Sequence, residues 1–206
     1  MSLRLNGSNS GFSEITAPAT AGDNTLTLPT GNGSANQYLA NGSTAGQLAF
    51  VTPPGSFTSY AIISDEKSND THGGTFTSGA FRTRDLNNEI ADPDGIVSIS
   101  SNQFTLGAGS YLILASAPAF RVDGHQARLY DITGDAVVEN GTVESSGSGD
   151  AITTRSFVTA RVVITGNTVY EVQHRGVSTT STFGFGPNVN FGGVEVYTIV
   201  EIYKEA

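Results

Sequence analysis

Apolar residues in the C-terminal part of the chain recur at every second position, which is the period of a β-strand. The clearest case is the run 193–203, GVEVYTIVEIY, because both of its faces are apolar: Val194, Val196, Val200 and Ile202 alternate with Tyr197, Ile199 and Tyr203. A strand that is half-buried in a monomer carries a polar second face. We therefore expect one face of this strand to meet the domain's own core and the other to meet a second subunit or layer.

The run 111–120, YLILASAPAF, repeats this two-faced pattern. Two such strands favour a permanent oligomer, because apolar area removed from water contributes about 25 cal/mol per Å² to association. The predicted interface residues are Tyr111, Ile113, Tyr197, Ile199 and Tyr203.

Further strand-like runs fill most of the second part of the chain, at 60–64, 76–84, 96–100, 103–106, 111–122 and 126–132. Two hairpins are also predicted. One joins 136–139 to 142–144 through Asn140-Gly141, and the other joins 157–165 to 168–173 through Gly166-Asn167. No helix is strongly signalled. The sequence therefore predicts an all-β fold, an antiparallel jelly-roll sandwich.

Residues 1–52 differ from the rest because they are rich in Gly, Ser, Thr, Asn and Ala, with isolated apolar residues. Such a segment buries little core by itself. We expect a short, extended, β-rich segment that gains order by intertwining with its own copies or by docking on a partner. Residues 53–57, PPGSF, begin with two prolines and predict a stiff linker, which places the jelly-roll domain at 58–206.

The formal charge of −9 disfavours nucleic acid and anionic membrane as partners, because both attract basic surfaces. The chain has no cysteine, which is consistent with synthesis in a reducing cytoplasm. It also has neither a long apolar run nor a cleavable leader. Eight of the ten basic residues are arginine, mostly inside strand-like runs. We expect paired contacts within or between subunits, with a guanidinium cluster that binds an acidic glycan as the alternative.

The sequence contains few of the residue patterns that are typical of catalytic sites. The three histidines, His72, His125 and His174, have no metal-ligand spacing, and neither a nucleophile elbow nor a Walker pattern occurs. We therefore expect no catalytic residues, no metal site and no cofactor. Carboxylate pairs such as Asp92 and Asp94 leave a glycosidase-like activity as a minor alternative.

Two loops are candidate contact surfaces. The glycine-rich loop 145–150 predicts a flexible tip that presents Ser146, Ser148 and Asp150. The loop 182–193, TFGFGPNVNFGG, carries Phe183, Phe185 and Phe191. It is either a packed cap over one end of the sandwich or an exposed aromatic platform for sugar stacking, with Phe183 and Phe185 as candidate contacts.

Residues 3–39, LRLNGSNSGFSEITAPATAGDNTLTLPTGNGSANQYL, resemble the N-terminal segment of bacteriophage tail-fibre and virion-decoration proteins, especially those of marine cyanophages. The run 79–131 resembles the C-terminal domain of many phage fibres, and GVEVYTIVEIYKEA resembles its last strand. That family is similar in architecture to the trimeric jelly-roll heads of tumour necrosis factor and complement-type domains.

The resemblance implies a homotrimer in which residues 1–52 anchor to another virion protein, a tail adaptor or the major capsid protein. The expected function is a short fibre that attaches to host surface polysaccharide and acts in the virion after synthesis in the host bacterial cytoplasm. Because almost no shaft separates anchor and head, a capsid decoration that stabilises the shell is an alternative. A polysaccharide depolymerase is a second alternative.

Overall fold

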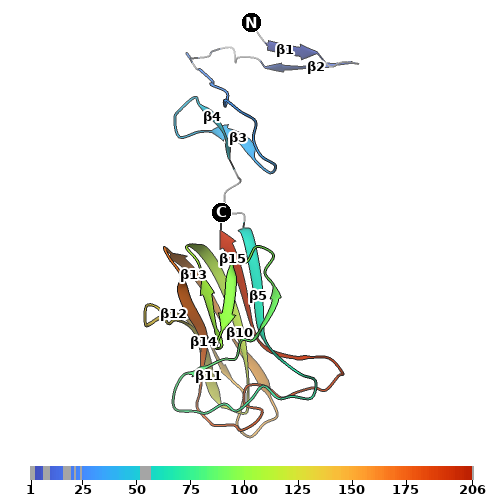
Figure 1. Cartoon of the computed structure of the whole chain (residues 1–206), viewed down its shortest axis with the longest axis vertical. Helices are drawn as coiled ribbons and strands as arrows, with labels where there is room; N and C mark the ends of the chain where they lie inside the picture. The colour runs from blue at the N-terminus through green and yellow to red at the C-terminus, as the bar shows by residue number, and fades with distance from the viewer. Residues whose placement is uncertain are drawn as a thin grey trace. The chain divides into compact units, whose positions relative to one another are not determined.

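The structure is a computed structural model that describes residues 3–6, 10–15, 20, 22–23, 25–51 and 57–205. Its strands are β1 (Leu3–Asn6), β2 (Phe12–Ile15), β3 (Tyr38–Asn41), β4 (Leu48–Val51), β5 (Phe57–Lys67), β6 (Arg82–Thr83), β7 (Asn88–Ala91), β8 (Val97–Ser100), β9 (Gln103–Leu106), β10 (Gly109–Phe120), β11 (Gly124–Asp131), β12 (Ala136–Ser145), β13 (Thr153–Ile164), β14 (Thr168–Gly176) and β15 (Glu195–Glu205). Figure 1 shows these strands along the chain.

The chain divides into two compact units, Met1–Pro54 and Gly55–Ala206, with the division inside the predicted linker 53–57. Residues 52–56 lie outside the described residues, so the stiffness predicted for the linker stays a prediction. In the first unit, β1 pairs with β2 and β3 pairs with β4, both antiparallel. An isolated bridge joins Thr27 to Gln47.

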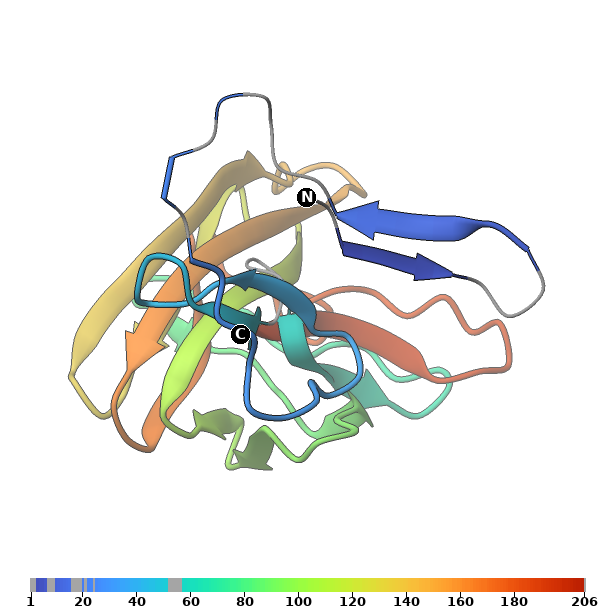
Figure 2. The ribbon, with the colours of Figure 1, turned by 90° about the horizontal axis from the view of Figure 1, so that it is seen from above.

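The second unit is a sandwich of two antiparallel sheets. The five-stranded sheet has the order β13-β10-β15-β5-β7, and the six-stranded sheet has the order β12-β11-β14-β9-β8 with β6 paired to β14. From β9 onward, every connection except β11 to β12 crosses between the sheets. Figure 2 views the sandwich from its C-terminal end. This winding is a jelly roll, so the predicted all-β fold class is confirmed.

The core fills the space between the two sheets, since the inward residues alternate along each strand. Its largest fully buried apolar side chains include Phe104, Leu106, Tyr111, Ile113, Leu129, Tyr170 and Ile202. A smaller cluster of Phe76, Ala119, Val122 and Phe185 closes one end of the sandwich. Within the described residues, no helix is long and apolar enough to cross a membrane.

The hairpin predicted at Asn140-Gly141 is wrong. Both residues lie within β12, which runs without interruption beside β11, and Arg128 pairs with Asn140 next to a bulge in the ladder. A Cβ on Gly141 would lie 2.6 Å from the carbonyl oxygen of Phe157 on β13. The glycine is therefore required by a close strand approach and not by a turn.

Two other sequence predictions also need correction. Gly166-Asn167 does form a turn, but the strands on either side, β13 and β14, belong to different sheets, so it is a crossover and not a hairpin. Of the strand predicted at 76–84, only β6 forms. Phe76 makes an isolated bridge to Thr180 and packs its ring into the end of the core.

Candidate functional site

The structure places Tyr111 and Ile113 inside the protomer. Each is 1% exposed, and Tyr111 donates its hydroxyl to the carbonyl of Gly107 at 3.1 Å. Neither side chain is available to a second subunit, so their assignment to an interface is corrected. The outward residues of β10 are their neighbours Leu112 and Leu114, both half-buried in the protomer.

The three interface residues predicted in β15, Tyr197, Ile199 and Tyr203, do not all point to the same side of the sheet. Tyr197 is 4% exposed and donates its hydroxyl to the carbonyl of Thr71 at 2.7 Å, so its assignment to an interface is also corrected. Ile199 and Tyr203 point outward and are half-buried. The cause is a register shift between Val196 and Ile199, which breaks the period of two. It places the Tyr197 side chain on the inner side of the sheet, where Val200 also lies.

Ile199 and Tyr203 belong to a largely apolar surface on the outside of the five-stranded sheet, which also carries Glu201. In the ladder, Leu112 pairs with Tyr203 and Tyr203 with Tyr60, while Leu114 pairs with Glu201 and Glu201 with Ile62. We call this surface the apolar sheet face, and it consists of Tyr60, Ile62, Leu112, Leu114, Phe157, Ile199 and Tyr203. Tyr60 is 43% exposed and Phe157 is 53% exposed.

The apolar sheet face has a shallow hollow and a charged rim. The hollow has a volume of about 210 Å³ and lies among Leu114, Phe157, Ile199 and Glu201. At one edge, Arg161 binds the Glu205 carboxylate in a bidentate ion pair with distances of 2.8 and 2.6 Å. An apolar centre with a polar rim is the composition of a protein–protein interface.

The loop after β12 is more ordered by hydrogen bonds than its sequence predicts. Ser146 is fully buried and its hydroxyl accepts a hydrogen bond from the Val122 amide, so its assignment to a contact surface is corrected. Ser148 and Asp150 are exposed. The amide of Ser148 donates to the Asp123 carboxylate at 2.7 Å, which holds the exposed part of this loop.

The loop 182–193, which we call the aromatic loop, is mostly a cap over one end of the sandwich. Phe185 is 8% exposed and lies under the guanidinium of Arg84, whose Cζ is 3.8 Å from the ring centre. Phe183 is half-buried and makes edge contacts with His72 and Phe120. The alternative in which Phe185 belongs to an exposed aromatic platform for sugar stacking is therefore wrong.

Phe191 is 90% exposed at the tip of the same loop. The carboxylate of Glu195 accepts hydrogen bonds from the amides of Val189 and Asn190, and the amide of Gly192 donates to Asn69. The tip thus presents an aromatic ring on a backbone that several hydrogen bonds hold. The sequence names Phe191 as part of the loop but gives no signal that separates it from Phe185.

A polar cluster lies inside the sandwich near the capped end. His125 Nδ1 is 2.9 Å from His174 Nε2, and His125 Nε2 is 2.7 Å from the hydroxyl of Thr154. Burial lowers the pKa of His125 to about 4 and holds the pKa of His174 well below its ordinary value. Both imidazoles are therefore neutral at pH 7, which suits a structural hydrogen-bonded pair.

Arg84 is a further polar residue inside the sandwich, close to His125 and His174. It is fully buried and donates to Thr198 at 2.9 Å and to the carbonyls of Pro118 and Phe185 at 3.2 and 3.1 Å. Burial lowers its pKa to about 9, which still leaves the guanidinium charged at pH 7. These bonds tie β15, β10 and the aromatic loop together. Within the described residues, no group of three or more His, Asp or Glu side chains has the arrangement of a metal site.

Comparison with known proteins gives likenesses of fold. No family model matches the sequence, and neither does any curated protein. Similar solved structures include murine APRIL (9% identity, 71% of this chain and 98% of that chain, TM-score 0.45) and the globular domain of the zebrafish complement 1qA protein (11%, 70% and 95%, 0.43). Another is the Eiger TNF of S. frugiperda (13%, 73% and 94%, 0.48). These structures are of the tumour-necrosis-factor and complement types, and the likeness carries nothing about ligand or partner.

Proposed function

We propose that this chain is a structural protein of a bacteriophage particle, a homotrimeric short fibre whose jelly-roll head attaches to host surface polysaccharide. The observation that carries the proposal is the apolar sheet face. It gathers seven apolar side chains on one side of the sandwich, where copies of the chain can meet. The number three follows from the resemblance to phage fibres.

The first unit supports an anchoring role. Its described residues leave large apolar side chains in solvent, including Ile15 at 69%, Leu26 at 66% and Leu28 at 69% exposed. A unit that buries so little depends on other surfaces for its order. We assign that surface to another virion protein, bound through residues 1–52, which resemble the N-terminal segment of phage fibre and decoration proteins over residues 3–39.

The ends of the head support an outward-facing contact surface. Phe57, where the head begins, pairs with Glu205 at one end of the sandwich. The aromatic loop meets the opposite end, since Phe120 at the end of β10 donates its amide to Gly184. A head held at Phe57 therefore has its Phe191 loop at the end away from the attachment point. Binding loops on a rigid β scaffold are a common arrangement.

One observation favours a second candidate, a decoration on the capsid. In its described residues the first unit forms two strand pairs, and only residues 52–56 separate β4 from β5, so no long shaft connects this strand pair to the head. A decoration needs no reach, because it binds the shell directly. In that case the trimer and its anchor are unchanged, and only the location differs.

Electron microscopy of particles with labelled protein tests the proposal. We expect label at the tail, whereas label over the shell would select decoration and absence from particles would contradict both. Deletion of residues 1–54 should abolish incorporation and leave the head folded and trimeric. A head that fails to fold after this deletion would contradict the assigned independence of the two units.

A further inference from the structure

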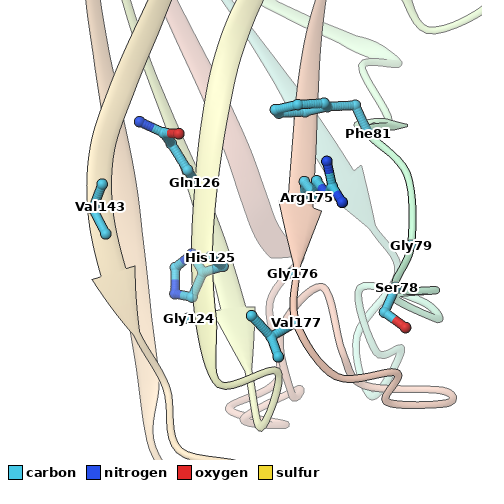
Figure 3. A pocket seen from close by; sticks show the side chains of 10 residues that line it. All are labelled: Ser78, Gly79, Phe81, Gly124, His125, Gln126, Val143, Arg175, Gly176 and Val177. Atoms are coloured by element: carbon cyan, nitrogen blue, oxygen red, sulfur yellow. The ribbon is translucent and has the colours of Figure 1, made fainter.

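The outer face of the six-stranded sheet contains an open pocket of about 700 Å³ that none of the predicted contact residues lines. We call it the sheet pocket. Figure 3 shows its lining residues, which lie on or beside β11, β12, β14 and the segment before β6. Those used below are Ser78, Phe81, Gln126, Val143, Arg175 and Val177. It lies on the side of the sandwich opposite the apolar sheet face, so the proposed trimer leaves it open.

The ladder sets the spacing of the pocket wall. Val143 on β12 pairs with Gln126 on β11, and Gln126 pairs with Arg175 on β14, so the three form one row across the sheet. Val143 is 78% exposed and Val177, just after β14, is 71% exposed. Two exposed valines beside an exposed arginine give the wall both an apolar and a cationic part.

Arg175 is distinguished by its lack of a partner. Among the basic side chains that the structure describes, it alone makes no hydrogen bond, ion pair or ring contact, whereas Lys67, Arg82, Arg84, Arg121, Arg128, Arg155, Arg161 and Lys204 each have one. In addition, no residue that lines the pocket is acidic, although the chain carries a formal charge of −9. The pocket is therefore a locally cationic site on an acidic protein.

The neighbours of Arg175 are held in place. The Nε2 atom of Gln126 donates to the carbonyl of Gly141 at 2.8 Å, which fixes the amide. The guanidinium of Arg128 lies 3.7 Å from the centre of the Phe81 ring and covers it. The hydroxyl of Ser78 is 3.0 Å from that of Thr179. A wall fixed by its own contacts loses little entropy when it binds a ligand.

We propose that the sheet pocket binds a carboxylated sugar residue of an acidic polysaccharide. A guanidinium binds a carboxylate through two parallel N–H donors. Val143 and Val177 offer apolar contact for the C–H groups of a sugar ring, and Gln126 and Ser78 offer polar groups to its hydroxyls. A small inorganic anion would leave the apolar part of the wall unused. The inference rests on the proposed attachment function and names the class of its ligand.

Calorimetry on the full chain tests the inference with an oligosaccharide of glucuronic acid units and a glucose oligosaccharide of equal length. We expect the acidic oligosaccharide to bind at least about tenfold more tightly, and Arg175→Ala to remove at least about tenfold of that affinity. Ser98→Asp is the matched control. It lowers the net charge by the same amount at an exposed position on β8 of the same sheet and should leave binding unchanged.

Introducing a positive or a negative charge at Val143 separates a binding role of the sheet pocket from a structural one. Because this side chain is 78% exposed, both Val143→Lys and Val143→Glu should fold normally. We expect the lysine variant to bind the acidic oligosaccharide more tightly and the glutamate variant to bind it less tightly. Equal affinities for the two variants, no binding to the wild-type chain, or full affinity in Arg175→Ala would each overturn the proposal.

Adsorption of the full chain to host cells distinguishes two negative outcomes. In one the sheet pocket does not bind the acidic sugar, and in the other the attachment function itself is wrong. If adsorption persists while the oligosaccharide binds no better to wild type than to Arg175→Ala, attachment stands and the sheet pocket is not its site. If the wild-type chain does not adsorb to cells, the attachment function itself is wrong.

Discussion

The two outer faces of the sandwich are built on similar antiparallel sheets and differ in how their side chains are satisfied. On the six-stranded sheet, Arg128 donates to Gln173 at 2.7 Å, and the Glu171 carboxylate accepts from Thr83 and Gln103. Apart from Arg175, the charged side chains at the centre of that face find partners within it. The apolar sheet face instead presents half-buried leucine and isoleucine and partly exposed aromatic side chains, with the Glu201 carboxylate among them accepting from Tyr203. The contrast indicates that one face requires a covering surface and the other does not.

The largest expected effect comes from a charge in the apolar sheet face. Ile199→Asp would bury an unpaired carboxylate in every subunit of the proposed trimer, at a cost on the order of several kcal/mol each. We expect light scattering to show single chains in place of trimers. The control is Ser98→Asp on the other sheet, which should remain trimeric. Trimers that survive Ile199→Asp would place the interface elsewhere.

The next prediction compares the inner and the outer face of β10. Ile113 is 1% exposed in the core, so Ile113→Ala should lower the free energy of unfolding of the head by about 2 to 5 kcal/mol. Leu114 lies on the outward side, and Leu114→Ala should instead weaken association. Denaturant unfolding measured in the monomeric Ile199→Asp background distinguishes them, since only Ile113→Ala should shift the midpoint strongly there. Equal shifts would contradict the assignment of faces.

The sequence predicts that β10 and β15 have two apolar faces but not which face is inside. A period of two is symmetric with respect to the faces, and the choice depends on contacts that are distant in sequence, such as those between the sheets. In β10 the hydroxyl of Tyr111 finds its partner at Gly107 only when the ring points inward. In β15 the register shift moves Tyr197 to the inner side, and no local pattern signals it.

The strand positions themselves could largely be predicted, because alternation is a local property. Strand β9 and most of β10 lie where the alternation predicts them. Asn140-Gly141 is misread because the same dipeptide serves a turn or a close approach between strands, and only the nearby carbonyl of Phe157 decides between them. The sheet pocket could not be predicted, since its wall is assembled from four separate segments.

A further loss of folding stability is expected at acidic pH. The folded-state pKa of His125 is about 4, below its ordinary value of 6.5, because burial disfavours the charged ring, and His174 is shifted in the same direction. The stability that the neutral rings contribute is complete above pH 6.5 and is lost as the pH falls. For His125 the loss runs down to about pH 4, by up to about 1.4 kcal/mol per pH unit.

Urea unfolding of the Ile199→Asp monomer at pH 7.5, 6 and 5 measures this loss. The double variant His125→Gln with His174→Gln should show a flatter dependence on pH over that range, whatever its stability at pH 7.5. The slope is the quantity to compare, because the substitutions also alter packing between the sheets. The same slope in both proteins would show that the histidine pair is not the source of acid sensitivity.

The smallest effect on stability is expected at the tip of the aromatic loop, at the end of the sandwich rather than on either face. Phe191 is 90% exposed, so Phe191→Ser should change the free energy of unfolding by less than about 0.5 kcal/mol. The hydrogen bonds from the amides of Val189 and Asn190 to Glu195 keep the loop backbone in place without the ring. If the tip contacts the host surface, this variant should adsorb to cells more weakly while remaining trimeric, and Phe191→Tyr should adsorb normally because it keeps an aromatic face. Unchanged adsorption of Phe191→Ser would remove the tip from the contact surface and leave the sheet pocket and the exposed Ser148 and Asp150 as candidates.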